Sequence, residues 1–321
     1  MSEQKRQDRY KKNTFIEKYF RQINSRLEGV DRSIIKEINS STEPSPVFII
    51  GLQRSGTTLL NQLLINQFNF AYPSNFLARF WNAPLTGLLL QNNLNFKADV
   101  SYKSNLGYTE GLSGPHEFGY FWKHWFPWDA FEKTFQKSSI DNEKIVKIMR
   151  AIQTMEDRPW IFKNLHKVNF QIETLHQLFP SAVFLYIKRE PLFVQQSTYQ
   201  SRIELFGTVE NWFGIKPPEY LELKSKPVME QIAGQIFHSE RYIENSLENI
   251  LKDKFFQIEF ENLVANTKLV LNSLYAFFVK NNIKIDKPSE HKAFDFSNRN
   301  KLRLSSDKVK KMKNALIAYY D

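Results

Sequence analysis

The stretch VFIIGLQRSGTTLLNQLL, residues 47–64, constrains the fold more than any other part of the chain. A continuous apolar run leads into a loop bounded by Gly51 and Gly56, and an apolar helical pattern follows the loop. Proteins build phosphate cradles in this order, because backbone amides at a helix N-terminus point at the anion. The stretch therefore predicts an anion site at the end of a buried strand. A tight strand-to-helix turn without a ligand is the alternative.

The loop departs from the Walker pattern G-x-x-x-x-G-K-[ST] of nucleotide triphosphatases. In that pattern a lysine follows the second glycine and reaches the terminal phosphates. Here Thr57 and Thr58 follow the glycine and offer hydroxyl donors, while Arg54 supplies the positive charge. A P-loop kinase or nucleotide triphosphatase is kept as an alternative, but the missing lysine and the lack of a clear Walker-B strand argue against it.

From residue 47 onward, short apolar runs alternate with longer helical patterns. Continuous apolar strands separated by helices are typical of a parallel sheet that is covered on both faces. The sequence thus predicts an α/β fold of three layers, with a mostly parallel central sheet. The strand-like runs cover residues 47–52, 159–164, 182–189 and 255–260, and the helical stretches cover residues 59–68, 168–179, 191–206 and 228–250.

The organisation along the chain follows from the same patterns. Residues 1–42 have apolar residues near helical spacing and end in a polar stretch, which predicts an N-terminal helical arm. Residues 43–321 are expected to form a single α/β domain, in which about residues 75–158 make a helical insertion, or lid, on the substrate side of the cradle. The apolar residues of the arm are Phe15, Tyr19, Phe20, Ile23 and Leu27.

Composition narrows the chemistry. The chain has no cysteine, which excludes disulfides and thiolate metal sites and favours a cytoplasmic setting. The six histidines are scattered and form no metal-binding motif, so no metal is expected. No run approaches the roughly 18 apolar residues of a membrane span, so we expect no transmembrane segment.

The net charge of +10, from 44 basic and 34 acidic residues, suits an anionic partner such as a nucleotide, an acidic glycan, nucleic acid or a lipid surface. Seven basic residues lie between Arg299 and Lys313 beside the single acid Asp307, and a solvated helix face is the alternative interpretation. A non-catalytic module that binds an anionic ligand is a further alternative. Because no RNA-binding or helix-turn-helix pattern is present, we expect no nucleic-acid partner, while peripheral membrane contact stays open.

A second cluster lies in AVFLYIKREPLFVQQSTYQSR, residues 182–202. The strand ends near Arg189, Pro191 suits the first turn of a helix, and Ser197 follows Arg189 by eight residues, about two helical turns. If this strand neighbours the first one, Arg189 and Ser197 would lie at the same sheet edge and could hold a second phosphate. A surface arginine and an unrelated helix serine are the alternative.

The two stretches GLQRSGTTLL and IKREPLFVQQST resemble the 5′-phosphosulfate loop, [K/R]-S-G-T-T, and the 3′-phosphate motif, R-[D/E]-P-x-x-x-x-x-S, of sulfotransferases. That family uses 3′-phosphoadenosine 5′-phosphosulfate as its sulfuryl donor. Two further segments, PWIFKNLHKVNFQIETLHQLFPSA and IEFENLVAN, are similar to segments of the broad bacterial and tyrosylprotein-like branch, in the same order. The resemblance covers about residues 45–280.

The resemblance implies a role for each matching position. Arg54 and Lys163 would neutralise the leaving phosphate as the S–O bond breaks, where fixed cations are the largest catalytic term. A strand-end lysine that pairs with a surface acid is the alternative for Lys163. The donor's 5′-phosphate would be bound by Ser55, Gly56, Thr57 and Thr58 together with Arg54, and its 3′-phosphate by Arg189 and Ser197.

The acceptor hydroxyl needs a base, and SGPHEFGYFW, residues 113–122, offers Glu117 with His116 as its partner or substitute. A carboxylate walled by Phe118 and Tyr120 is expected to have a pKa raised by desolvation. The alternative is that Glu117 caps a helix and that His116 is a turn histidine. His124 and His166 are weaker rivals for the role of base.

The acceptor is expected to be a small-molecule or glycan hydroxyl. Aromatic residues between Tyr120 and Trp128, together with Trp212, could stack on sugar rings and so favour a carbohydrate or glycolipid. The same rings could wall a pocket for an apolar alcohol, or simply form packed core. The resemblance also suggests that residues 298–303, NRNKLR, lie near the 3′-phosphate, although they lack the R-K-G-x-x-G form of the cytosolic branch, and the sequence leaves open whether they close over the nucleotide. The sequence has no signal for the oligomeric state.

Overall fold

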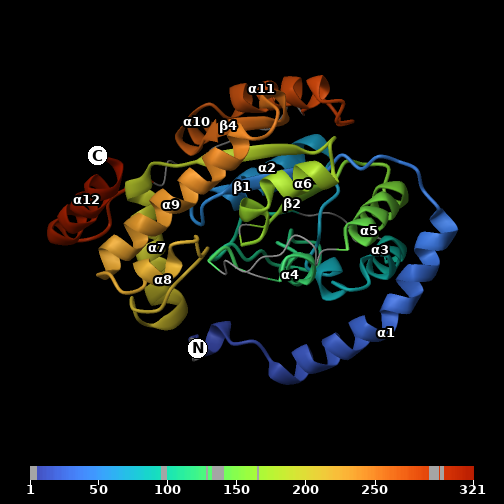
Figure 1. The fold of residues 1–321 in the computed structure, drawn as a ribbon, viewed down its shortest axis with the longest axis horizontal. Coiled ribbons are helices and arrows are strands. Elements are labelled where there is room, and N and C mark those ends of the chain that lie inside the picture. The colour runs from blue at the N-terminus through green and yellow to red at the C-terminus, as the bar shows by residue number, and fades with distance from the viewer. Residues whose placement is uncertain are drawn as a thin grey trace.

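The computed structural model describes residues 6–94, 100–127, 129–131, 141–164, 166–288, 296 and 300–321. At its centre lies a four-stranded parallel sheet with the strand order β2-β1-β3-β4 (Figure 1). Gly51, at the end of β1, is in register with Ile187 on β3, so these two strands end side by side. The strands are β1 (Val47–Gly51), β2 (Ile161–Lys163), β3 (Val183–Lys188) and β4 (Phe255–Glu259).

Helices cover both faces of this sheet, and Figure 1 shows α11 on one side and α4 on the other. The α-helices are α1 (Thr14–Ile38), α2 (Thr57–Phe68), α3 (Pro84–Asn93), α4 (Gly119–Trp125), α5 (Asn142–Met155), α6 (Ile172–Leu178), α7 (Pro191–Phe206), α8 (Tyr220–Leu223), α9 (Val228–Glu248), α10 (Phe260–Ala265), α11 (Thr267–Lys280) and α12 (Ser306–Tyr320). Short 3₁₀ helices are η1 (Asp8–Tyr10), η2 (Leu77–Arg79), η4 (Val168–Phe170) and η5 (Lys252–Lys254).

The alternation of side chains along β1 separates the core into two layers. Phe48 and Ile50 pack with residues of α4, α5 and α9, whereas Val47 and Ile49 pack with residues of α2 and α11. Both faces of the strand are therefore buried, as its unbroken apolar sequence predicts. The predicted three-layer α/β fold with a parallel sheet is confirmed.

The predicted elements coincide with the observed ones, with differences at their ends. The stretch 191–206 matches α7 in full, and 228–250 matches α9 except that the helix ends at Glu248. The stretch 168–179 is not one helix, because the chain leaves the helical conformation at Gln171, between η4 and α6. The stretch 59–68 lies in α2, which begins earlier, at Thr57.

The region before the sheet contains one long helix. Helix α1 runs along the outside of the molecule (Figure 1) and packs against α3 and α5, both from the region expected to form the insertion. Asn13 caps its first turn, since the Asn13 side chain accepts a hydrogen bond from the Ile16 amide. Within the described residues, no helix has the length and apolar content needed to cross a bilayer.

Candidate active site

The loop between β1 and α2 has three residues with positive φ, a backbone conformation that favours glycine. Gly51 has φ +147°, and a Cβ placed there would lie 2.6 Å from the carbonyl oxygen of Ile187 on β3. Gly56, at the N-cap of α2, has φ +103°, and between the two glycines Arg54 has φ +68°. The glycine spacing read from the sequence thus has a steric cause. The loop also leads the chain into the N-terminus of α2, and helix N-termini favour anions.

Two side chains hold the loop from within. Asn169 accepts a hydrogen bond of 3.1 Å from the Gly51 amide and donates one of 2.6 Å to the Gly51 carbonyl. The hydroxyl of Ser55, which is 1% exposed, donates to the Leu52 carbonyl at 2.8 Å. Ser55 therefore supports the shape of the loop, and its role towards a 5′-phosphate stays a prediction. Asn169 was not singled out from the sequence, which has no local signal for it.

The structure brings the two predicted phosphate motifs together. Nη1 of Arg189 donates to the carbonyl of Arg54 at 2.9 Å, and Nε of Arg54 donates to Oγ of Ser197 at 2.8 Å. These contacts join residues more than a hundred positions apart because β1 and β3 are neighbours that end at the same edge. Two guanidinium groups and a hydroxyl thus meet beside the glycine loop, which is a suitable arrangement for an anion with more than one phosphate.

Arg189 has further partners from later parts of the chain. Its Nε and Nη2 donate to Oδ1 of Asn300 at 2.9 and 2.7 Å, and Asn300 in turn donates to Glu261 at 2.6 Å. The guanidinium also lies 4.6 Å from the centroid of the Phe260 ring. Asn300, Glu261 and Phe260 are contacts that sequence reasoning did not assign, although Asn300 belongs to the basic stretch expected near the nucleotide.

The segment around Asn300 lies against α7. The side chain of Gln196 donates to the Lys301 carbonyl at 2.9 Å and accepts from the Arg303 amide at 2.7 Å. Within the stretch 298–303, positions 298 and 299 lie outside the described residues. The part that is described therefore sits beside Arg189, and its place near a 3′-phosphate stays a prediction.

Lys163, at the end of β2, connects the loop with the candidate base. Its Nζ lies 2.7 Å from Oε1 of Glu117 and 3.0 Å from Oγ1 of Thr58, and its side chain is 4% exposed. The Glu117 backbone is fixed as well, because Asn164 donates to the Glu117 carbonyl at 3.1 Å. The partner of Lys163 is thus a carboxylate within the site, not a surface acid.

The protonation state of Glu117 differs from the sequence-based expectation. Burial raises the pKa of Glu117, but the charges of Lys163 and His166, the hydrogen bond from Lys163 and a smaller effect of His116 outweigh burial, and the pKa of Glu117 is lowered. The expectation of a raised pKa is wrong, because it rested on neighbouring rings and could not include Lys163. Glu117 also makes no side-chain cap to α4, which has Phe118 at its N-cap position.

The pKa values of the histidines near the site are lowered by desolvation. Burial lowers the pKa of His116 to about 4, and Nδ1 of His116 accepts a hydrogen bond of 2.9 Å from the Phe118 amide. Desolvation by the surrounding protein also lowers the pKa of His166, a residue that keeps exposed surface, against the opposing charges of Glu117 and Asp129. His124 lies elsewhere, in a small pocket between α1, α4 and α5. His116 therefore offers a buried neutral ring beside Glu117, and no role as a base is established by this arrangement.

A tight turn that the sequence did not reveal covers Lys163 and Glu117. Asn105 and Tyr108 exchange backbone hydrogen bonds of 2.9 and 2.8 Å, with φ +50° at Leu106 and +89° at Gly107. A Cβ on Gly107 would lie 3.8 Å from Oε1 of Glu117 and 3.9 Å from Nζ of Lys163. The turn therefore forms one wall of the site.

The aromatic residues expected to stack on an acceptor are buried. In α4 and just after it, Phe121, Trp122, Trp125 and Phe126 belong to the core. Trp212 is 4% exposed, and its Nε1 donates to the Ile215 carbonyl at 2.9 Å. Trp128 lies outside the described residues. The expectation that these buried rings stack on sugars is wrong, and the packed-core interpretation is correct. The rings of α4 and Phe126 pack with α5 and the sheet, and Trp212 packs with Tyr220 and Leu223.

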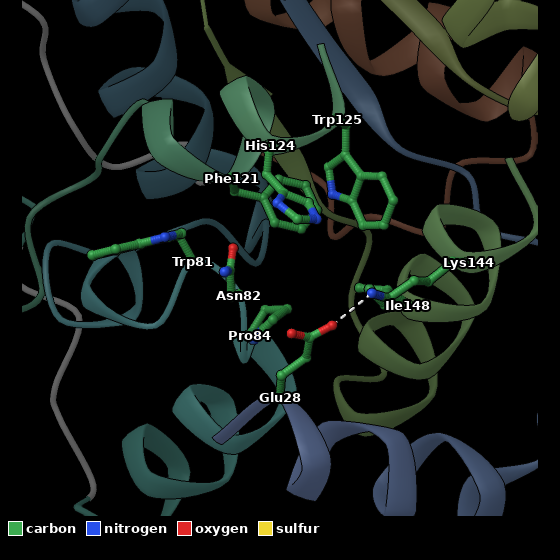
Figure 2. Close-up of a pocket in the computed structure, with 9 residues that line it drawn as sticks. All are labelled: Glu28, Trp81, Asn82, Pro84, Phe121, His124, Trp125, Lys144 and Ile148. Carbon is green, nitrogen blue, oxygen red and sulfur yellow. Dashed lines mark hydrogen bonds and ion pairs between the residues drawn. The ribbon is translucent and has the colours of Figure 1, made fainter. Parts of the chain in front are cut away.

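The pocket drawn in Figure 2 is too small for a substrate. It has a volume of about 10 Å³, enough for roughly one water molecule, and it lies where α1, α4 and α5 meet. The candidate active site lies elsewhere, at the carboxyl ends of β1, β2 and β3. Over the described ranges, no group of three or more histidine, aspartate or glutamate side chains is arranged to hold a metal ion.

Comparison with known proteins identifies a family. The model of the sulfotransferase family matches residues 46–279. The omega-hydroxy-beta-dihydromenaquinone-9 sulfotransferases Stf3 of Mycobacterium bovis and Mycobacterium tuberculosis are each 23% identical in an alignment of 248 residues that covers 72% of this chain and 61% of the relative. The chain thus spans less than two thirds of the length of these relatives.

Two solved structures have a similar fold. Sulfotransferase STF9 from Mycobacterium avium superposes with a TM-score of 0.53 at 14% identity, covering 96% of this chain and 78% of that one. Sulfotransferase STF1 from Mycobacterium tuberculosis superposes with a TM-score of 0.52 at 13% identity, covering 92% of this chain and 78% of that one. At such identities the likeness concerns the fold alone.

Proposed function

The chain belongs to the sulfotransferase family, and from this premise we propose that it transfers a sulfuryl group from 3′-phosphoadenosine 5′-phosphosulfate to an acceptor hydroxyl. The observation that carries this proposal is the junction of the two phosphate motifs, where Arg189 binds the Arg54 carbonyl and Arg54 binds Ser197. A nucleotide with phosphate groups on both sides of its ribose could bind one phosphate at the glycine loop and the other at Arg189 and Ser197.

The proposed donor-binding roles rest on where each residue lies in the fold. Gly56, Thr57 and Thr58, at the start of α2, hold the 5′-phosphate through the helix N-terminus and the threonine hydroxyls. Arg189 and Ser197 hold the 3′-phosphate. Arg189 donates to the neutral amide oxygen of Asn300, and a phosphate is the stronger acceptor because it is charged. The 3′-phosphate therefore displaces Asn300 from Arg189 when the donor binds.

The chain's own residues have two tasks in the proposed reaction: to accept the proton of the acceptor hydroxyl and to stabilise the leaving phosphate. The donor supplies the activated sulfuryl group. Glu117 takes the proton of the acceptor hydroxyl, whose oxygen forms the new bond to sulfur as the bond between sulfur and the phosphate oxygen breaks. Arg54 and Lys163 neutralise the charge that develops on that phosphate oxygen.

Lys163 links these two tasks. A carboxylate with a lowered pKa is a weak base, so Glu117 gains basicity only when the ammonium group of Lys163 moves away from it. The donor's phosphosulfate attracts the same ammonium group, which already reaches Thr58 at the start of α2. We therefore propose that donor binding draws Lys163 from Glu117 and so prepares the base only when the sulfuryl group is present.

The acceptor we propose is a hydroxyl on an apolar or amphiphilic small molecule. The Stf3 relatives are named for omega-hydroxy-beta-dihydromenaquinone-9. The buried state of Phe121, Trp122 and Trp212 removes the stacking surface that favoured a free carbohydrate. A glycolipid remains within the proposed class. The chemistry requires only that the acceptor oxygen reach Glu117 past the turn at Gly107.

Calorimetric titration tests the donor site. The full chain is titrated with adenosine 3′,5′-bisphosphate, with ATP and with 5′-AMP, and the series is repeated on Arg189→Ala and on the control Arg241→Ala, an exposed arginine of α9. We expect the bisphosphate to bind best, and Arg189→Ala alone to weaken it by about 10- to 100-fold, the range for one charge-assisted pair. Equal or tighter binding of ATP, or no binding at all, would overturn the donor assignment and favour the kinase or the non-catalytic alternative.

A further inference from the structure

Helix α1 has an apolar stripe on its outer side. Phe15 is 68% exposed, Tyr19 45%, Ile23 43% and Val30 45%. These residues follow one another at intervals of four, four and seven, so they lie along one side of the helix. Ile16, which is 43% exposed, adjoins them. A row of large apolar side chains in water along one helix is unusual and marks a surface that meets a partner.

The acidic side chains of α1 lie on the opposite side and fasten the helix to the body. Glu28 forms an ion pair of 2.8 Å with Lys144 on α5 (Figure 2). Asp31, which is 3% exposed, accepts hydrogen bonds from the Leu85 and Thr86 amides at 2.9 and 2.8 Å. Glu17 accepts a hydrogen bond from the Tyr120 hydroxyl. Three of the four acids of the helix are thus turned towards the protein.

The basic side chains of the helix are exposed. Only one acid, Glu37, is exposed over Thr14–Ile38. At helical spacing Arg26 falls within the apolar side and Lys18 and Lys36 flank it, whereas Arg32 pairs with Glu28 at 3.6 Å. The outer surface of α1 therefore combines apolar residues with an excess of positive charge. The exposed basic residues are Lys18, Arg21, Arg26, Arg32 and Lys36.

We propose that the outer face of α1 docks on the surface of a phospholipid bilayer that contains anionic lipids. A helix with an apolar stripe, a basic flank and low overall hydrophobicity lies in the plane of the interface, with its apolar side chains below the headgroups and its cations at the lipid phosphates. The 25 residues of α1 give a contact about 37 Å long. A second copy of this chain is the poorer occupant, because a symmetric contact would bring basic flanks together.

The segment that leads into α1 connects this surface with the candidate active site. This segment binds the end of α7, where the Gln7 amide donates to the Leu205 carbonyl at 2.9 Å. In the same segment the Tyr10 hydroxyl accepts a hydrogen bond of 3.2 Å from Asn105, in the turn that covers Lys163 and Glu117. Docking of α1 therefore brings this turn close to the bilayer. The inference does not depend on the proposed sulfuryl transfer, but the two together would supply amphiphilic acceptors from the membrane.

Vesicle flotation tests the surface. The full chain is mixed with vesicles of equal parts phosphatidylglycerol and phosphatidylcholine, or of phosphatidylcholine alone. The variant is Phe15→Ser with Ile23→Ser. The control is Leu269→Ser with Val279→Ser on α11, where the side chains are 62% and 53% exposed. All four positions are exposed, so both variants should fold, and their denaturation midpoints verify this.

We expect the wild type and the α11 control to float with the anionic vesicles, less at high salt, and the α1 variant to bind at least about tenfold more weakly. Lys18→Glu with Arg26→Glu should weaken binding too, whereas Lys310→Glu with Lys313→Glu on α12 should not. Absence of wild-type binding, or equal loss in the α1 and control variants, would overturn the inference. Loss of a dimer in sedimentation velocity without any vesicle binding would assign the surface to a second copy instead.

Discussion

The ammonium group of Lys163 lies 2.7 Å from a carboxylate oxygen of Glu117, and it also contacts the Thr58 hydroxyl at 3.0 Å. These residues come from the end of β2, the segment before α4 and the first turn of α2. One buried cation therefore joins the glycine-bounded loop to the candidate base. The position of the Lys163 ammonium group therefore determines whether its positive charge acts mainly on Glu117 or on the loop at Thr58.

Replacement of Lys163 by methionine should change the pH dependence of activity in a defined direction. Burial would still act on Glu117, but the main opposing charge would be gone, so the pKa of Glu117 rises. The acid limb of the pH–kcat/KM profile should move to higher pH, and kcat should fall about 100-fold or more because a leaving-group cation is lost. Steady-state rates between pH 5 and pH 9 provide the measurement, with ~0.5 pH intervals.

Lys144→Met is the matched control for this experiment, because Lys144 forms an ion pair of 2.8 Å with Glu28 away from the site. It should leave the acid limb in place. An acid limb that stays unchanged in Lys163→Met would contradict the assignment of Glu117 as the titrating group.

Gly51→Ala should destabilise the fold. The new Cβ would lie 2.6 Å from the Ile187 backbone oxygen, which cannot move without breaking the register of β1 and β3. We expect the free energy of unfolding to fall by roughly 2–4 kcal/mol. Urea denaturation followed by circular dichroism measures it. The control is Gly29→Ala within α1, where only Arg32 comes near, at 3.7 Å; it should be neutral or stabilising by up to about 1 kcal/mol. Equal midpoints for the two variants would refute the steric account.

Gly107→Ala tests the turn over the site. With φ +89° at this position, alanine costs roughly 1 kcal/mol or more in backbone strain, and the turn should shift above Lys163 and Glu117. We expect a several-fold higher KM for the acceptor with unchanged affinity for adenosine 3′,5′-bisphosphate. Gly111→Ala is the control, because it has φ +74° and nothing within 4 Å of its added Cβ. If both variants raise the acceptor KM alike, backbone strain in this region would explain the effect, and the role of the turn as a wall of the site would be contradicted.

His116 should make folding stability depend on pH. Burial lowers its pKa from 6.5 to about 4, so the unfolded chain binds a proton at a higher pH than the folded chain does. The contribution to stability is complete above about pH 6.5 and is lost as the pH falls towards about 4. His116→Asn keeps an acceptor for the Phe118 amide but removes the titration. The stability difference between wild type and variant, measured by urea unfolding, should therefore move in favour of the variant as the pH falls from about 6.5 towards about 4. Parallel pH profiles would contradict this assignment.

Part of the candidate site could be predicted because its residues lie at strand ends. Arg189 follows one apolar run and Arg54 follows another, and adjacent parallel strands bring such positions to the same edge. The conformation of the loop was also readable, since Gly51 and Gly56 occupy positions where a side chain would collide. What could not be read is which distant residues complete the site. Asn169, Asn300 and Gly107 have ordinary sequence surroundings, and only the folded chain brings them to Gly51, Arg189 and Glu117.

The sequence by itself determined the class of the fold, the glycine-bounded loop and the positions of the two predicted phosphate motifs, because these depend on local patterns of apolar residues, glycines and charges. Tertiary structure decided the protonation of Glu117 and the exposure of the aromatic residues. The pKa of Glu117 depends on Lys163, 46 positions away in the chain. Trp122 and Trp212 are buried because of what packs on them, not because of their neighbours in sequence. Electrostatic and packing energies depend on distance in space, and that distance is set only when the chain has folded.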